Sequence, residues 1–359
     1  MGKKIGGFDW LTLVFLLALA CFGLFLLLTT DKSLFYQQLL YVIVSCFVFL
    51  IVSMVDRVVL TWFSPFAYIL CLVLLLLSYL GPEIRGATRW IFIGPIRLQP
   101  SELVKPLLIL FFSWLSVKKS PRIAKNIPIH IGFFIIPFLL VFKQPDLGSS
   151  LVYVLFWIGI LVAGGLPIRY LVFSIISSFL LLPGLWNLMA GYQKDRILTF
   201  INPAIDPQGA GYNAIQSMIT VGSGQLFGRG LGLGTQSHLR FLPEYHTDFI
   251  FATLAEELGF LGAIVLILIY AVLLWRLLLL CWGNSHDLLV YVFGSGLFFM
   301  ILSQLFINIG MNIGLLPITG ITLPFVSYGG SSLLSLSLSF GVLNALINKR
   351  GEIKSVAIR

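Results

Sequence analysis

The sequence predicts an all-α polytopic membrane protein, with about ten transmembrane helices and a large extracytoplasmic loop between spans seven and eight. The chain is 58% hydrophobic and only 10% charged, and its mean hydropathy is +1.01, whereas soluble domains carry about 25% charged residues. Its hydrophobic residues fall in runs that approach or exceed the roughly 20 residues needed to cross a bilayer. One long segment, about 190–247, interrupts these runs. We therefore expect a single integral membrane domain over residues 1–359.

Ten apolar runs define the expected spans. Several are shorter than about 20 residues, so we expect them to recruit flanking polar residues or to lie in protein-lined surroundings. The first run continues without a break to Leu28, which favours an uncleaved span over a signal peptide. The runs are 10–28, 35–55, 64–80, 103–117, 128–142, 151–163, 170–188, 249–280, 288–309 and 331–347.

The basic residues predict the orientation of the chain. A net charge of +9 is typical of a membrane protein whose cytoplasmic loops are rich in Lys and Arg. The strongest anchors of this kind are the segments 118–125 and 348–354. Both termini are therefore expected on the cytoplasmic side of the cytoplasmic (inner) membrane. Because no basic surface interleaved with aromatic residues stands out, no nucleic acid partner is predicted.

Nine Lys and Arg residues fall on the expected outer face, and this orientation does not explain them. Seven of the nine lie in the two loops 81–101 and 191–247, among them Arg89 in the first and Arg196, Arg229 and Arg240 in the second. They indicate either an anionic ligand on the outer face or solvated loop charge, and position alone does not separate the two interpretations.

Ionisable residues also gather at the outer ends of the spans. Glu102 and Lys105 are three residues apart, so they share one helix face and can pair. Asp146 lies in the next outer loop. Together the three residues suggest a small ionic cluster under the outer surface, where membrane proteins place substrate or proton sites. The alternative is a structural clamp.

Asp248 stands where the large loop enters the eighth apolar run, and we expect it to be the chemical centre. A carboxylate at the mouth of a hydrophobic segment is costly unless function requires it. The glycines that precede it allow close backbone approach to a ligand, but they match neither a Walker nor a dinucleotide pattern. His238, Glu244 and His246 do not have the spacing of a zinc site with Asp248. No metal ligands are therefore predicted.

Further acids follow inside the eighth run. Glu256 lies eight residues after Asp248 and so falls close to the same helix face, whereas Glu257 points about 100° away. We expect structural hydrogen bonds from these acids inside the protein, against Asn308 or Asn312.

Three irregular segments complete the outer face. The segment 89–93 alternates like a short β-strand, and 212–219 is amphipathic and expected at the membrane interface. The segment 315–332 contains two prolines and a Gly-Gly pair, and is expected to form an irregular outer lid.

Four stretches of the chain resemble the SEDS family (shape, elongation, division, sporulation), in that family's order and over nearly the whole chain. They are GATRWIFIGPIRLQPSELVK, QPDLGSS, the stretch from GYNAIQSM to HTDFIFATLAEELG, and NIGLLPITGITLPFVSYGGSS. The wording FLPEYHTDFIFA and the short tails are most similar to the family's elongation member. The resemblance implies a peptidoglycan glycosyltransferase that polymerises lipid II on the outer face of the membrane. It also implies ten spans.

The resemblance implies partners as well. They are a class B penicillin-binding protein, which crosslinks the product, other proteins of the elongation complex, and the membrane lipid around the lipid II substrate.

The resemblance carries roles to individual residues. Asp248 in HTDF matches the family's essential aspartate. This chain has Tyr245 at the position, three residues before that aspartate, where an arginine is common in the family, and so it lacks one cation beside the site. The other matching positions are Glu102, Lys105 and Asp146, expected to be catalytic, and Arg89, Arg196 and Gln216, expected to bind substrate.

The implied chemistry is a transfer with one inversion, from an α-linked diphosphate to a β-linked polymer. Asp248 acts as the base on the attacking 4-hydroxyl, which contributes about 10²–10⁴-fold. Arg229, Arg240 and His246 join the expected substrate-binding residues, because positive charge and hydrogen bonds stabilise the departing undecaprenyl diphosphate. A divalent cation, Mg²⁺ or Mn²⁺, is left open as a further stabiliser.

Two functions of other classes stay open from the residues alone. A lipid II flippase or other transporter suits the ionic cluster, although transporter sites usually lie near the membrane midplane. A scaffold that only holds a partner enzyme would tolerate the loss of Asp248.

Overall fold

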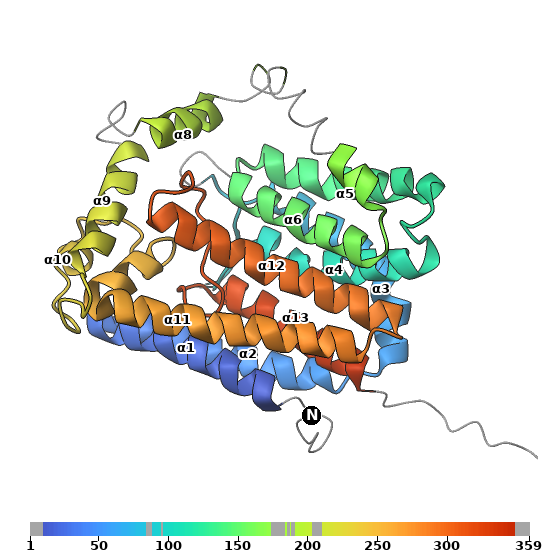
Figure 1. Ribbon diagram of the computed structural model, residues 1–359, viewed down its shortest axis with the longest axis horizontal. Helices are drawn as coiled ribbons and strands as arrows, with labels where there is room; N and C mark the ends of the chain where they lie inside the picture. The colour runs from blue at the N-terminus through green and yellow to red at the C-terminus, as the bar shows by residue number, and fades with distance from the viewer. Residues whose placement is uncertain are drawn as a thin grey trace, which may run out of the picture.

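Long helices that lie side by side make up most of the described chain (Figure 1). The computed structural model describes residues 10–83, 88–94, 96–173, 184, 187, 191–202 and 210–348. The helices are α1 (Trp10–Thr30), α2 (Lys32–Ser53), α3 (Arg57–Ser78), α4 (Pro100–Lys118), α5 (Ile127–Lys143), α6 (Leu147–Ala163), α8 (Gly191–Ile201), α9 (Ala210–Ser223), α10 (Thr235–His238), α11 (Ile250–Gly283), α12 (Leu288–Asn312) and α13 (Gly330–Ile347), with the 3₁₀ turn η1 (Ala124–Asn126) before α5.

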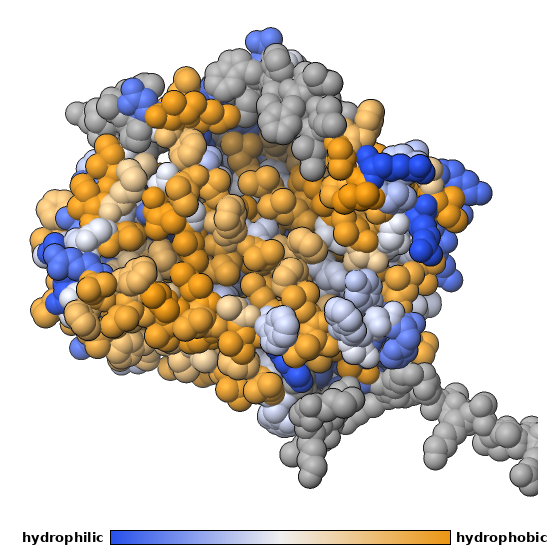
Figure 2. Space-filling model, viewed as in Figure 1, coloured by the Kyte–Doolittle hydropathy of each residue, from blue (hydrophilic) through white to orange (hydrophobic). Residues whose placement is uncertain are grey.

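The predicted membrane fold is confirmed over the described ranges, in which eight helices are long and apolar enough to cross a bilayer. They are α1 to α4, the continuous segment of η1 and α5 (Ala124–Lys143), and α11 to α13, whereas α6 is apolar but shorter than this segment. The predicted span 170–188 lies mostly outside the described residues. Figure 2 shows a hydrophobic middle on the visible face, with hydrophilic residues gathered toward the two ends of the helices.

The helices divide into a central group and a peripheral one. In the apolar windows of α4 and α13, 78% of the residues are buried, against 17% in α2. The centre is polar for a membrane core, since α13 buries five serines, among which the hydroxyls of Ser335 and Ser339 bond to neighbouring carbonyls. Such hydroxyls let helices approach closely in a membrane.

Three helices begin after an aspartate that acts as an N-cap. Asp31 accepts the backbone N–H of Ser33 at the start of α2, and Asp146 accepts that of Ser149 at the start of α6. Asp287 caps α12 in the same way. Aspartate is favoured here because its carboxylate satisfies N–H groups that the first turn leaves free.

A short β-hairpin joins α3 to α4. Its strands, β1 (Ile91–Ile93) and β2 (Ile96–Leu98), pair antiparallel with Ile91 opposite Leu98. The strand-like alternation expected over 89–93 is therefore confirmed for the last three of those residues.

Helix α11 is broken at Gly259, whose backbone angles are φ 68° and ψ −167°. The break leaves the carbonyls of the preceding turn without helical partners. The glycine-rich segment fills it: the N–H groups of Arg229 and Gly230 donate to the carbonyls of Glu256 and Glu257, at 2.9 and 3.1 Å. The part of α11 after the break is still long enough to cross a bilayer.

This arrangement corrects the expected role of the glycines. A Cβ on Gly228 would lie 2.1 Å from the carbonyl oxygen of Glu257, and a Cβ on Gly224 would lie 1.8 Å from that of Ala255. The close backbone approach is thus made to α11 and not to a ligand.

Candidate active site

Asp248 is half-buried, two residues before α11 begins. Its carboxylate faces the segment between α12 and α13, because a Cβ built on Gly320 would lie 3.4 Å from Oδ2 of Asp248. Its backbone carbonyl accepts hydrogen bonds from Nδ2 of both Asn308 and Asn312, each at 3.0 Å. The side chain is therefore presented by a peptide that α12 holds in place.

The segment between α12 and α13 forms one wall of this site. The hydroxyl of Ser327 donates to the carbonyl of Thr247 at 2.6 Å, and the N–H of Tyr328 donates to the carbonyl of His246 at 2.9 Å. The irregular lid expected over 315–332 is thus bonded to the two residues that precede Asp248. Together with the bonds from Asn308 and Asn312, these contacts give the backbone carbonyls of His246, Thr247 and Asp248 a hydrogen-bond donor each, which fixes the backbone that carries the Asp248 carboxylate.

His246 is neutral at pH 7 in this setting. Burial lowers its pKa, and the charge of Arg240 lowers it further, while Glu244 and Asp31 oppose the shift. Its ring lies edge-on to that of Tyr328, 5.5 Å between centroids. His246 therefore offers the site a hydrogen-bonding imidazole rather than a second positive charge.

The predicted pair of Glu102 and Lys105 is present at the start of α4. Nζ of Lys105 lies 2.5 Å from Oε1 of Glu102, and both side chains are buried. Asp146 adjoins the pair through Ser101, whose hydroxyl donates to Oδ2 of Asp146 at 3.1 Å, and through Gln99 at 3.3 Å. The three residues thus share one polar region, in which Asp146 also caps α6.

The guanidinium of Arg89 is engaged by the protein itself. Nε donates to the carbonyl of Gln144 at 2.8 Å, and another nitrogen donates to the carbonyl of Pro145. Arg89 therefore holds the turn that leads into Asp146, whether or not it also meets substrate.

Two other predicted arginines, Arg229 and Arg240, lie on the large loop. Arg229 donates to the carbonyl of Ser223 and to the hydroxyl of Thr235, on the glycine-rich segment. Arg240 is exposed, and its charge contributes to lowering the pKa of Asp31 after the hydrogen bonds at Ser33.

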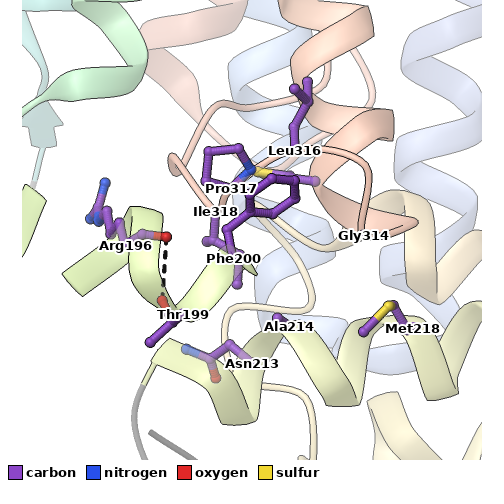
Figure 3. A pocket seen from close by; sticks show the side chains of 11 residues that line it. Arg196, Thr199, Phe200, Asn213, Ala214, Met218, Gly314, Leu316, Pro317 and Ile318 are labelled. Carbon is purple, nitrogen blue, oxygen red and sulfur yellow. Dashed lines mark hydrogen bonds between the residues drawn. The ribbon is translucent and has the colours of Figure 1, made fainter. Parts of the chain in front are cut away.

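Arg196 lines a cavity of about 140 Å³ between α8, α9 and the segment after α12. In Figure 3 it lies at one edge, while Phe200 faces Pro317 and Ile318. The cavity is mixed in character, since Asn213 and Thr199 also line it. Gln216 lies on α9 but is not among the lining residues.

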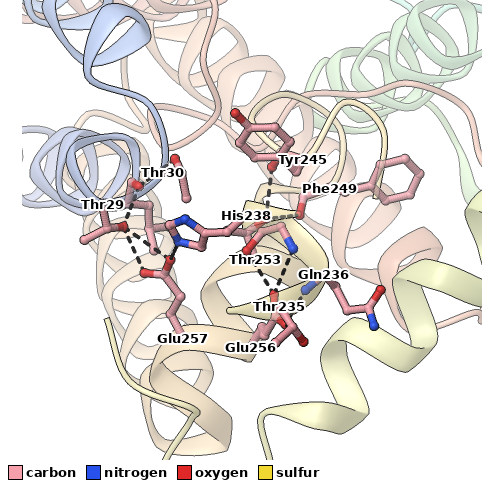
Figure 4. A network of polar contacts seen from close by, with 12 residues as sticks. Thr29, Thr30, Thr235, Gln236, His238, Tyr245, Phe249, Thr253, Glu256 and Glu257 are labelled. Atoms are coloured by element: carbon pink, nitrogen blue, oxygen red, sulfur yellow. Dashed lines mark hydrogen bonds and ion pairs between the residues drawn. The ribbon is translucent and has the colours of Figure 1, made fainter. Parts of the chain in front are cut away.

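Glu256 and Glu257 are buried and hydrogen-bonded, as expected, but not to the predicted asparagines (Figure 4). Glu256 accepts the N–H groups of Gln236 and Ser237 at 2.8 and 3.2 Å, which caps α10. The remaining partners are Thr29 and His238, which contact Glu257. The two acids therefore fasten the large loop to α11.

Sequence reasoning missed the partners of Asp248. Asn308, Asn312, Gly320 and Ser327 lie in the NIGMNIGLLPITGITLPFVS stretch, which was singled out as part of a lid, for its asparagines and for the family resemblance, but not as a support for Asp248. Two asparagines spaced i, i+4 near the end of an apolar run were the available signal, because polar amides inside a span need partners.

The sequence of this chain is similar to those of known proteins. A family model described as "Cell cycle protein" (FtsW, RodA, SpoVE) matches residues 7–351. The peptidoglycan glycosyltransferase MrdB of Escherichia coli K12 is 40% identical over 292 residues, which are 80% of this chain and 78% of MrdB. Stage V sporulation protein E of Bacillus subtilis strain 168 is 38% identical over 321 residues, 87% of each chain.

Solved structures share the fold. A chain from a peptidoglycan synthase complex, described as coordinating polymerization and crosslinking, is similar with a TM-score of 0.84 and 29% identity, over 97% of this chain and 100% of that one. The rod shape determining protein RodA of Thermus thermophilus is similar with a TM-score of 0.73 and 27% identity, over 98% of this chain and 100% of that one.

Proposed function

This chain belongs to the FtsW, RodA and SpoVE family of cell cycle proteins, and from that premise we propose that it is a peptidoglycan glycosyltransferase that polymerises lipid II into glycan strands. MrdB of Escherichia coli K12, which is 40% identical, carries the name peptidoglycan glycosyltransferase. The observation that carries the proposal for this chain is the half-buried Asp248 carboxylate beside Gly320. The backbone carbonyls of residues 246–248 all accept hydrogen bonds that fix its position.

Asp248 acts as the general base in an inverting transfer. As its carboxylate takes the proton of the acceptor's 4-hydroxyl, that oxygen forms a bond to C1 of the donor sugar. The bond from C1 to the undecaprenyl diphosphate breaks on the opposite face, and the electron pair leaves with the diphosphate. A positioned base of this kind contributes about 10²–10⁴-fold.

Cationic side chains near the site would bind the departing diphosphate. Arg196, at the edge of the cavity beside Pro317, is the predicted arginine that lines a hollow. Among the described residues, no three His, Cys, Asp or Glu side chains converge as metal ligands.

The orientation follows from where the basic residues lie. Arg57, the first residue of α3, and Lys118, the last residue of α4, lie at the end of the bundle where α1 begins, opposite Asp248. Cytoplasmic ends carry the excess of Lys and Arg. We therefore place both termini in the cytoplasm of a cell whose inner membrane holds the protein, with Asp248 on the extracytoplasmic face.

A crosslinking partner suits this function. The similar chain of known structure comes from a complex that coordinates polymerization and crosslinking. By that likeness, a class B penicillin-binding protein and other elongation-complex proteins are the proposed partners, with lipid II reaching the site from the membrane.

The test is polymerisation of lipid II by the purified full-length protein. We expect Asp248→Asn to make no glycan polymer, since the amide cannot accept the proton. Asp31→Asn is the matched control, because it removes an acid from the same end of the bundle and asparagine caps a helix as well as aspartate does. Full polymer yield from Asp248→Asn would contradict the proposal, and movement of lipid II between vesicle leaflets without polymer would favour a flippase.

A further inference from the structure

If α11 began one residue earlier, the carbonyl of Asp248 would accept the first hydrogen bond of the helix. In an α-helix, the carbonyl of residue i accepts the N–H of residue i+4, which here is Ala252. The N–H of Ala252 instead donates to Oδ1 of Asn312 at 3.1 Å, and Nδ2 of Asn312 donates to the Asp248 carbonyl at 3.0 Å. The amide of Asn312 is thus inserted between the two backbone groups.

The helix begins immediately after this insertion. The N–H of Thr253 donates to the carbonyl of Phe249 at 3.1 Å in the ordinary helical pattern. Asp248 is therefore kept one residue outside the regular helix by a side chain from α12.

Asn308, one turn earlier on α12, joins the two walls of the site. Its Nδ2 donates to the carbonyl of Asp248 at 3.0 Å and to that of Ile321 at 2.7 Å. Ile321 follows Gly320, the residue that faces the Asp248 carboxylate. One amide thus sets the distance between the acid and the opposite wall.

Both amides are fully committed. Asn308 and Asn312 are 0% exposed, and Nδ2 of Asn312 also donates to the Asn308 carbonyl at 2.8 Å. Each NH₂ group therefore has a carbonyl acceptor for each of its two hydrogens, and Nδ2 of Asn312 also lies 3.4 Å from Oδ1 of Asn308. These acceptors also determine which way each amide is oriented, because a flipped amide would oppose oxygen to oxygen.

We propose that Asn308 and Asn312 are positioning residues for the reaction of Asp248, an inference that rests on the function proposed above. Asn312 splits the first turn of α11, and Asn308 ties the acid to the wall at Gly320. Without Asn312, the N–H of Ala252 can bond directly to the Asp248 carbonyl, and the helix extends toward the carboxylate. A misplacement of about 1 Å can cost about 10²-fold in rate.

The first test is the steady-state rate of lipid II polymerisation by full-length Asn312→Leu, a change that keeps the number and branching of the side-chain heavy atoms but removes every hydrogen bond of the amide. We expect kcat to fall at least about tenfold, with KM for lipid II within about twofold of the wild-type value. Asn344→Leu is the control, since Asn344 is a buried asparagine on α13 whose Nδ2 has no partner among the described residues. A kcat for Asn312→Leu within twofold of wild type, or an equal loss in the control, would overturn the inference.

A second variant keeps the test decisive if Asn312→Leu does not fold. Asn308→Ala removes one donor to Asp248 and is expected to lower kcat at least about fivefold, again with KM unchanged. A loss expressed in KM alone would mean that Asn308 serves binding and not the position of the base.

A double variant asks whether Asn308 acts through Asp248. Asp248→Glu already displaces the carboxylate, so adding Asn308→Ala should cost much less than it does in the wild type, because residues that act as a unit are not additive. Fully multiplicative losses would overturn the inference. The proposed function fails separately, by polymer formation in Asp248→Asn, so the two failures are distinguishable.

Discussion

The ammonium group of Lys105 lies 2.5 Å from Oε1 of Glu102 one turn earlier on α4, and both side chains are buried. Breaking a buried pair by removing one partner costs about 3–5 kcal/mol, whereas replacing both partners is often close to neutral. The pair therefore offers a way to separate its contribution to stability from its contribution to catalysis.

We expect Lys105→Met alone to lower the thermal midpoint in detergent by several degrees, because it leaves the Glu102 charge buried and unpaired. The double variant Glu102→Gln with Lys105→Met should recover most of that loss. If the pair supports catalysis, as the family resemblance implies, polymerisation by the recovered double variant stays below about a tenth of wild type. Full activity in the double variant would reduce the pair to a structural clamp.

The contact between Gly320 and Asp248 predicts that this glycine is required for activity. Gly320 has φ +75°, and a Cβ there would touch Oδ2 of Asp248 at 3.4 Å. We expect Gly320→Ala to reduce polymerisation about tenfold or more, because strain at a positive φ shifts the wall that faces the carboxylate. The control is Gly232→Ala, at φ +71° with open space around the Cβ. Equal activity in the two variants would show that the contact with Asp248 does not matter.

The packing of the glycine-rich segment on α11 predicts a folding defect rather than a catalytic one. Gly228 has φ +80°, and its Cβ would lie 2.1 Å from the Glu257 carbonyl oxygen, which the backbone must move to avoid. We expect Gly228→Ala to lower the yield and the thermal midpoint of the purified protein, by more than the roughly 1–2 kcal/mol of the left-handed backbone alone. Gly222→Ala, with nothing near its Cβ, should behave as wild type. A normal midpoint for Gly228→Ala would mean that the segment is not packed as described.

The ion pair between Arg57 and Asp287 predicts a pH-dependent term in stability. Burial raises the pKa of Asp287, but hydrogen bonds from Arg57 and its charge lower it more, so the pKa is lowered overall. A carboxylate of this kind stabilises the fold above its unfolded pKa, about 3.9, and the stabilisation is lost as the pH falls through the folded value.

The variant Asp287→Asn keeps an N-cap residue but loses the ion pair. Because Arg57 is 30% exposed, we expect the variant to be less stable than wild type at pH 7 by about 1 kcal/mol or less. The thermal midpoints of the two proteins should lie closer together at pH 3 than at pH 7. A difference that is the same at both pH values would point to a cause other than this ion pair.

Local features were predictable from the sequence because they depend on spacing along one helix. The pair of Glu102 and Lys105 follows from a separation of three residues, and Asp248 was identified from its place at the mouth of an apolar run. The long apolar runs gave the membrane helices for a similar reason, since hydropathy and length act on each segment separately.

Contacts between distant elements were not predictable in this way. The asparagines expected to meet Glu256 and Glu257 instead hold the carbonyl of Asp248, which is 60 and 64 residues away along the chain. The glycines expected to approach a ligand approach a break in α11. Each outcome depends on how separate helices pack against each other, and this packing cannot be derived from the spacing of residues within one segment.

The sequence by itself determined that this chain lies in a membrane, which apolar runs are candidates to cross it, and which carboxylate stands at the end of a run. Hydrophobic length and the cost of a charge near lipid are enough for that. Only the tertiary structure decided what holds Asp248 in place and what the glycines pack against. The physical reason is that every backbone group near lipid must find a partner, and the three-dimensional packing alone settles which partner is within reach.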